Sequence, residues 1–119
     1  MAQHNTLGKK GEALACEFLI RKGYKILVKN YRYKKFEVDI IAQVKDTIVA
    51  VEVKTRSTSD FGDPQDFVKP TQIKHLVETM DHYILSHELD CEVRFDIIGI
   101  ITNSLETKIE HLEDAFLHF

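Results

Sequence analysis

The chain has 119 residues, a length that suits one domain spanning residues 1–119, and its 44% hydrophobic and 29% charged residues are usual for a globular protein. Its longest apolar runs, at 48–51 and 97–101, are far shorter than the roughly 20 residues that a membrane-spanning helix needs. The N-terminal residues lack a basic segment followed by an apolar one, so no signal peptide is predicted. The composition argues against a membrane protein, and the cytoplasm is the expected compartment.

The charge of the chain is distributed unevenly, although the net charge is only -3. Residues 1–56 contain 12 of the 16 basic residues and 6 of the 19 acidic ones, a net charge of +6, whereas residues 57–119 carry a net charge of -9. This asymmetry indicates a surface that faces a polyanion, unless the two halves intermix in space and their fields cancel.

A helix is predicted to start after Thr6, a suitable N-cap residue, and to run to Lys22. Gly23 follows at the position where glycine commonly ends a helix. Leu7, Leu14 and Phe18 are spaced so that they form an apolar stripe on one side of this helix. That stripe predicts that the helix packs on the rest of the domain.

Three strands are predicted next, at residues 24–33, 36–44 and 47–55. In the first, the alternation predicts that Ile26 and Val28 share one face, opposite Lys25 and Lys29. A tight turn at 45–46 joins the second and third strands into a hairpin.

The second half of the chain begins with a predicted loop at 57–70, followed by a helix at 71–87 and strands at 91–102 and 108–112. The strand at 91–102 is so continuously apolar that burial on both faces is expected. Asp96 interrupts it, either as a buried partner for a base such as Arg94 or as a surface residue at the end of the sheet. The predicted class is therefore α/β, a mixed five-stranded sheet flanked by helices.

The hairpin carries a group of charged residues at strand spacing. Side chains two residues apart on a strand share a face, so Glu37 points with Asp39, and Glu52 with Lys54. If the turn is centred on 45–46, partner numbers sum to 91 and Asp39 lies opposite Glu52. A register shifted by one residue would place the two acids on opposite faces.

Two facing carboxylates repel each other, and a divalent cation between Asp39 and Glu52 would remove that cost. Mg²⁺ prefers oxygen ligands, only a few of them from the protein. Lys54 would add positive charge beside the metal, an arrangement suited to phosphodiester hydrolysis. The alternative is the solvated face of an amphipathic hairpin, where alternating charges are ordinary.

Glu12 is a further candidate ligand, because it is in line with Cys16 and Leu19 on the first helix and so lies on or beside the packed stripe. Gly8 and Gly11 leave room there for a close approach. It could bind metal or water, or it could be an acid that favours the positive end of the helix.

Together, several motifs resemble the YraN-like uncharacterised bacterial proteins and, more distantly, the archaeal-type Holliday-junction resolvases. Both groups belong to the PD-(D/E)xK nuclease superfamily, which has the restriction-endonuclease-like fold. The similarity covers nearly the whole chain. The motifs are GKKGEA at 8–13, EVDIIA at 37–42, VEVKTR at 51–56, RFDII at 94–98 and HLEDAF at 111–116.

The resemblance implies that Asp39, Glu52 and Lys54 occupy the superfamily's catalytic positions, with Glu12 as the helix acid. It also implies that Val53 lends its backbone carbonyl to the metal. The chain departs from the family in two places: Phe36 replaces a usual glycine, and Gln72 stands where the second helix often has a basic residue.

Basic residues near these motifs are candidates for contacts with nucleic-acid phosphates, which contribute mainly sequence-independent, salt-sensitive affinity. The alternative for each is a solvated surface charge. Arg56 is the preferred candidate, because it follows Lys54 on the same strand face. The full set is Lys9, Lys10, Arg32, Lys35, Arg56 and Lys74.

The leading hypothesis is a nuclease that depends on Mg²⁺ or Mn²⁺ and acts on DNA, with branched or otherwise structured DNA among the candidate substrates. A second hypothesis is a non-catalytic nucleic-acid-binding module that retains the nuclease fold. A third is a protein-interaction adaptor, given the acidic second half. A homodimer is expected by analogy with the resolvases.

Overall fold

The computed structural model describes the backbone of residues 2–58 and 68–116, with side chains from residue 6 onward. The described part forms two helices and five strands. In chain order these are α1 (Ala2–Arg21), β1 (Lys25–Tyr33), β2 (Phe36–Val44), β3 (Thr47–Arg56), α2 (Pro70–Ser86), β4 (Glu92–Thr102) and β5 (Thr107–Leu112).

The five strands form one sheet in the order β1-β2-β3-β4-β5. Only β3 and β4 are parallel, and α2 lies between them in the chain, because parallel neighbours need a long crossover connection. The predicted α/β class with a mixed five-stranded sheet is confirmed.

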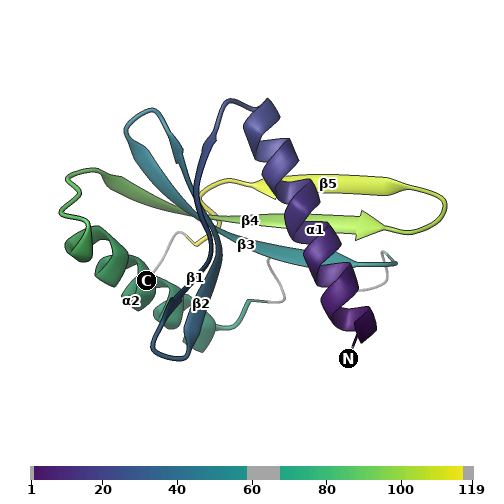
Figure 1. Cartoon of the computed structure of the whole chain (residues 1–119), viewed down its shortest axis with the longest axis horizontal. Coiled ribbons are helices and arrows are strands. Elements are labelled where there is room, and N and C mark those ends of the chain that lie inside the picture. The colour runs from purple at the N-terminus through teal and green to yellow at the C-terminus, as the bar shows by residue number, and fades with distance from the viewer. Residues whose placement is uncertain (1, 59–67, 117–119) are drawn as a thin grey trace.

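The helices lie against opposite faces of the sheet, with α1 crossing the face toward the viewer in Figure 1. Ala15 and Leu19 of α1 are fully buried in one apolar cluster, and Leu76 and Met80 of α2 are buried in the other. The central strands contribute to both clusters. The prediction that β4 is buried on both faces is confirmed, since Ile98 packs under α1 and Phe95 packs with the α2 cluster.

Both helices begin earlier than predicted. α1 starts at Ala2 rather than after Thr6, because none of residues 2–5 is a glycine or proline that would stop the helix. α2 starts at Pro70 rather than 71, because proline's fixed φ and missing N–H are tolerated in a first helical turn. Gly23 follows α1 with a φ of 94°, as expected for a helix-ending glycine. The strand ends differ from the predicted ones by one residue at most.

The predicted alternation in β1 is wrong at one point. The pairing with β2 shifts between Ile26 and Val28, which leaves Leu27 as an extra residue in the ladder. A bulge of this kind reverses the facing of the residues beyond it. Ile26 therefore packs with the α1 cluster and Val28 with the α2 cluster.

The predicted register of the β2–β3 hairpin is confirmed. Val44 pairs with Thr47, and the ladder continues to Ile40 opposite Val51, so that partner numbers sum to 91. Lys45 makes the turn with a φ of 54°. This register matters for the candidate site, because it brings Asp39 of β2 and Glu52 of β3 to the end of the same ladder.

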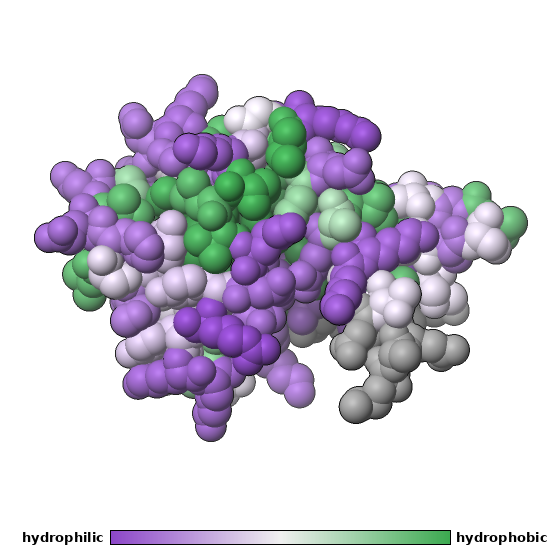
Figure 2. Space-filling view, viewed as in Figure 1, coloured by the Kyte–Doolittle hydropathy of each residue, from purple (hydrophilic) through white to green (hydrophobic). Residues whose placement is uncertain are grey.

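The surface seen in Figure 2 is mostly hydrophilic, with an apolar area beside the upper end of α1. Three large apolar side chains, Ile20, Leu85 and Leu105, are exposed among the described residues. Neither described helix has a stretch apolar and long enough to cross a bilayer.

Candidate metal and catalytic site

The candidate site lies where the β2–β3 ladder ends. The last paired residues are Ile40 and Val51, and Asp39 and Glu52 follow directly after them. Asp39 accepts a hydrogen bond through Oδ2 from the backbone N–H of Val53, at 2.9 Å. The carboxylate of β2 thus takes the place of a backbone partner for β3, and the two predicted acids come together across the strands.

Glu52 is buried, with 6% of its surface exposed. Its Oε2 accepts a hydrogen bond from Nε2 of Gln72 on α2, at 3.3 Å. Its Oε1 is buried and has no hydrogen-bond partner among the described residues. A buried carboxylate oxygen without a donor is costly, so this oxygen is a ready acceptor for a proton or a ligand for a cation.

Burial and repulsion by neighbouring carboxylates raise the pKa of both acids. Burial is the main cause of the rise in the pKa of Glu52 to about 8, and the nearby Asp39 carboxylate adds to it. Burial likewise raises the pKa of Asp39 to about 6, with Glu12 and Glu37 adding to the effect and the Val53 hydrogen bond opposing it. Two acids held in this way favour a shared positive charge.

Lys54 and Glu12 complete the predicted group. Lys54 lies close enough to lower the pKa of both Asp39 and Glu52 by its positive charge. Glu12 of α1 accepts a hydrogen bond from Nδ2 of Asn30 on β1, at 3.1 Å. The four residues thus come from one helix and two strands, and each interacts electrostatically with at least one of the others.

The close approach of α1 to β3 depends on Gly11. A Cβ built at this glycine would lie 1.8 Å from Oγ1 of Thr55 and 2.8 Å from its Cβ. By contrast, a Cβ at Gly8 would meet nothing within 4 Å. Of the two glycines noted in the sequence, only Gly11 is needed for contact, and it holds the adjacent Glu12 near the sheet.

The donor set is compatible with a hard divalent cation. No group of three or more His, Cys, Asp or Glu side chains in the described part of the chain is arranged to hold a metal ion. Mg²⁺ needs fewer protein ligands than that, because it keeps several waters and is commonly bound by one or two carboxylates. Asp39 and Glu52 meet this requirement, and the unpartnered Oε1 of Glu52 is an oxygen that such an ion would satisfy.

The predicted phosphate contacts are spread over several elements. Lys9, Lys10, Lys35 and Lys74 are exposed, and Arg32, also exposed, forms an ion pair with Glu37 at 3.3 Å. The preferred candidate is half-buried: Arg56 donates through Nη1 to the carbonyl of Thr55, at 2.9 Å. The structure does not gather these six residues into one described cluster, and their role remains a prediction.

Sequence reasoning missed two neighbours of the site, Gln72 and Asn30. The polar residue at 72 was noted only as a departure from the family, whereas it donates to the Glu52 carboxylate. Asn30 has a φ of 55°, which an asparagine tolerates, and it donates to Glu12. The other departure, Phe36, starts β2 and stacks on the His75 ring of α2 with centroids 3.8 Å apart. No local pattern connects these partners.

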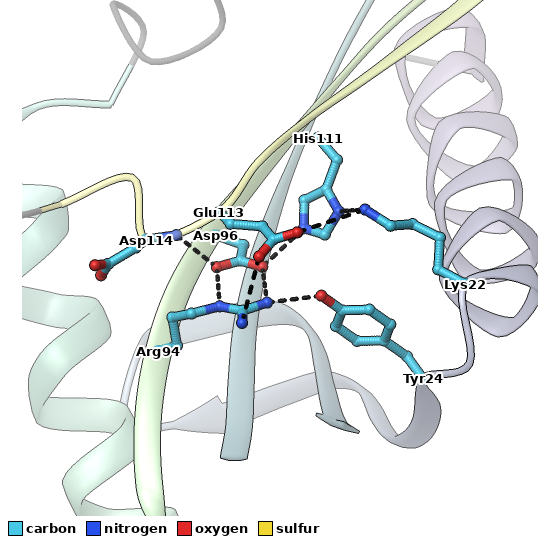
Figure 3. Close-up of polar contacts among 7 residues, drawn as sticks. All are labelled: Lys22, Tyr24, Arg94, Asp96, His111, Glu113 and Asp114. Atoms are coloured by element: carbon cyan, nitrogen blue, oxygen red, sulfur yellow. Dashed lines mark hydrogen bonds and ion pairs between the residues drawn. The ribbon is translucent and has the colours of Figure 1, made fainter. Parts of the chain in front are cut away.

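A second polar cluster lies on the α1 face of the sheet (Figure 3). Asp96 is fully buried and accepts hydrogen bonds from both Nε and Nη2 of Arg94, at 2.9 Å each. It also accepts from Nε2 of His111 at 2.7 Å and from the backbone N–H of Asp114 at 2.9 Å. Of the two alternatives for Asp96, the buried partner of Arg94 is correct. His111 was missed because it lies on another strand.

The described structure defines a class: an α/β protein whose mixed sheet holds one buried and one half-buried acid, a lysine and a helix acid around the end of a hairpin. The family comparison is more specific. Residues 11–100 match the model of the uncharacterised protein family UPF0102, and the chain belongs to that family.

Full-length relatives support this assignment. The chain is 63% identical to a UPF0102 protein of Christiangramia forsetii and 57% identical to one of Flavobacterium psychrophilum, in both cases over the whole of both chains. It is 40% identical to a UPF0102 protein of Phocaeicola vulgatus over 98% of this chain and 96% of the relative. The predicted resemblance to YraN-like proteins is thereby confirmed at the level of the family. These names state no activity.

Proposed function

We propose that the protein is a nuclease of restriction-endonuclease-like fold that hydrolyses phosphodiester bonds in DNA with the help of Mg²⁺ or Mn²⁺. Branched or otherwise structured DNA is the preferred substrate class. Asp39 and Glu52 would hold the metal, with Glu12 and the backbone carbonyl of Val53 as further oxygen ligands. Lys54 acts on the reacting phosphate.

One observation carries the proposal: the carboxylate of the half-buried Asp39 lies beside that of the buried Glu52, whose Oε1 has no donor among the described residues. A solvated hairpin face, the alternative, would expose these groups to water. Instead Glu52 is 6% exposed, and its pKa is raised to about 8. A shared cation would offset the cost of keeping two acids ionised at such a site.

The chain's own residues would act as follows. Asp39 and Glu52 position the ion, which when bound would lower the pKa of a water molecule and polarise the phosphate. The ammonium group of Lys54 stabilises negative charge that grows on the phosphate oxygens. Gln72 holds the Glu52 carboxylate in one orientation through the hydrogen bond to Oε2. Burial of Glu52 keeps competing water away from its carboxylate.

Cleavage of DNA by the purified full-length protein tests the proposal. The substrates are four-way junctions and linear duplexes, incubated with Mg²⁺ or Mn²⁺. We expect cleavage in the presence of the metal and its loss when a chelator removes the metal. The double variant Asp39→Ala/Glu52→Ala should be inactive. A matched double variant of two exposed acids, Glu17→Ala/Glu110→Ala, should cleave like the wild-type protein.

Two results would contradict the proposed nuclease. The first is cleavage that persists at the wild-type rate in the Asp39→Ala/Glu52→Ala variant. The second is binding of DNA without cleavage under any divalent metal, which would instead identify a non-catalytic nucleic-acid-binding module.

Replacing Lys54 with Met is expected to lower kcat by about 100-fold or more, the size found when one donor to a developing oxyanion is removed. Affinity for Mn²⁺ should be unchanged or higher, since a positive charge beside the ion is gone. Lys54→Arg should retain more activity, because the charge is kept. Measurement of kcat together with Mn²⁺ binding separates these effects. An unchanged kcat in Lys54→Met would remove this residue from the mechanism.

A further inference from the structure

The polar cluster of Figure 3 presents three donors to one place at the end of α1. Nη1 of Arg94 and Nζ of Lys22 both point toward the Glu113 carboxylate. Tyr24 contributes its hydroxyl, which accepts a hydrogen bond from Nη2 of Arg94 at 2.7 Å. A phenolic hydroxyl that accepts one hydrogen bond still has its own hydrogen to donate.

Contacts with the buried side chains of Asp96 and His111 hold Arg94 and Lys22 in position. Both Nε and Nη2 of Arg94 are bound to Asp96, which fixes the plane of the guanidinium group and directs Nη1 away from the sheet. Lys22 donates from Nζ to Nδ1 of His111 at 2.7 Å, and Nε2 of the same ring donates to Asp96 at 2.7 Å. The donor and acceptor in each of these two hydrogen bonds follow because an ammonium group can only donate and an ionised carboxylate can only accept.

Glu113 occupies this place only loosely. Its two oxygens lie 3.5 Å from Nη1 of Arg94 and 3.6 Å from Nζ of Lys22, longer than the roughly 2.7–2.9 Å of a direct charge-assisted hydrogen bond. Its side chain is 52% exposed, so a rotation into solvent would meet little resistance. The carboxylate is a weakly held anion at a site built from firmly held donors.

We propose that Arg94, Lys22 and Tyr24 form a binding site for a phosphate group, and that the Glu113 side chain covers this site when no phosphate is present. A phosphate presents acceptor oxygens in several directions, so one group can accept from a guanidinium, an ammonium and a hydroxyl together. A carboxylate has two oxygens in one plane and reaches only two of the donors here. The site faces α1, whereas Glu52 faces α2, so the inference does not depend on the proposed nuclease.

Binding of inorganic phosphate to the full-length protein tests this site, with backbone amide NMR shifts as the readout. The variant Glu113→Ala is expected to bind phosphate about three- to fivefold more tightly than the wild-type protein, the size of a competing surface ion pair. Adding Lys22→Ala or Tyr24→Phe to Glu113→Ala should reverse the gain. A cooperative thermal unfolding transition, as in the wild-type protein, will show that each variant is folded.

Glu110→Ala is the matched control, because it removes the same charge from an exposed position on β5. The proposal requires that this control leave phosphate affinity unchanged. It is overturned if Glu110→Ala and Glu113→Ala have equal effects, since the cause is then the net charge. It is also overturned if Lys22→Ala/Glu113→Ala binds phosphate as tightly as Glu113→Ala.

Two further probes distinguish the sources of the phosphate. A nucleoside 5′-monophosphate presents a phosphomonoester, and a dinucleotide presents only a phosphodiester. Competition by the monophosphate alone supports a free phosphate or phosphomonoester ligand, and equal competition by the dinucleotide supports a nucleic-acid backbone. Failure of both to compete with inorganic phosphate would contradict a site that is open to a phosphate ester.

Discussion

A Glu52→Gln variant is expected to be more stable than the wild-type protein at about pH 8, and the advantage should shrink toward about pH 5. The cause is the buried acid, whose pKa rises from 4.5 to about 8 in the folded protein. Each unit of pKa difference corresponds to about 1.4 kcal/mol, so the change should amount to several kcal/mol in metal-free protein.

The direction follows from proton binding. Between the two pKa values, the folded protein keeps a proton on Glu52 that the unfolded chain has lost. The free energy of unfolding therefore falls as the pH rises through this range. Asp39, with a folded pKa of about 6, contributes in the same direction at lower pH. The variant should keep this smaller contribution, because its glutamine removes only the titration at position 52.

Urea unfolding at several pH values, in the presence of a chelator, measures this effect. Glu110→Gln is the matched control, since its side chain is exposed on β5, outside the group of acids that raise the pKa of Glu52. That variant should have the pH profile of the wild-type protein. Parallel profiles for Glu52→Gln and the wild type would contradict the account. Millimolar Mg²⁺ should restore stability at high pH in the wild type and the control but not in Glu52→Gln, because a ligand that binds only the folded state stabilises it.

Replacing Gly11 with Ala is expected to destabilise the fold by about 1–3 kcal/mol, the usual cost of inserting a methyl group into a packed contact. All three side-chain atoms of Thr55 lie within 3 Å of the new Cβ, so a rotation of this short β-branched side chain does not relieve the clash. α1 must move instead, which displaces Glu12 from Asn30. Chemical unfolding measures the loss of stability.

Two variants show whether the clash is the cause. Gly8→Ala places the same substitution in the same helix where nothing lies within 4 Å, and it should be neutral or stabilising by up to about 1 kcal/mol. Thr55→Gly should recover part of the loss when it is combined with Gly11→Ala. If the two substitutions are additive in a double-mutant cycle, the helix is not held against β3 by this contact.

Much of the secondary structure was predictable because short-range sterics determine it. The alternation of apolar residues in 36–44 and 47–55 and the turn at 45–46 gave the hairpin and its register. The bulge at Leu27 was not predictable, because an extra residue in a ladder depends on the partner strand. The early start of α1 was missed because Thr6 is a good cap that the helix does not use.

The sequence by itself determined the order of helices and strands and the hairpin register, because apolar alternation and turn residues decide them. Only the tertiary structure decided how deeply Glu52 is buried, that Gln72 contacts it, and that Glu12 reaches the sheet through Gly11. Packing between elements sets these features. The same holds for the contact of Arg94 with Tyr24, which are 70 residues apart and meet only once the sheet has formed under α1.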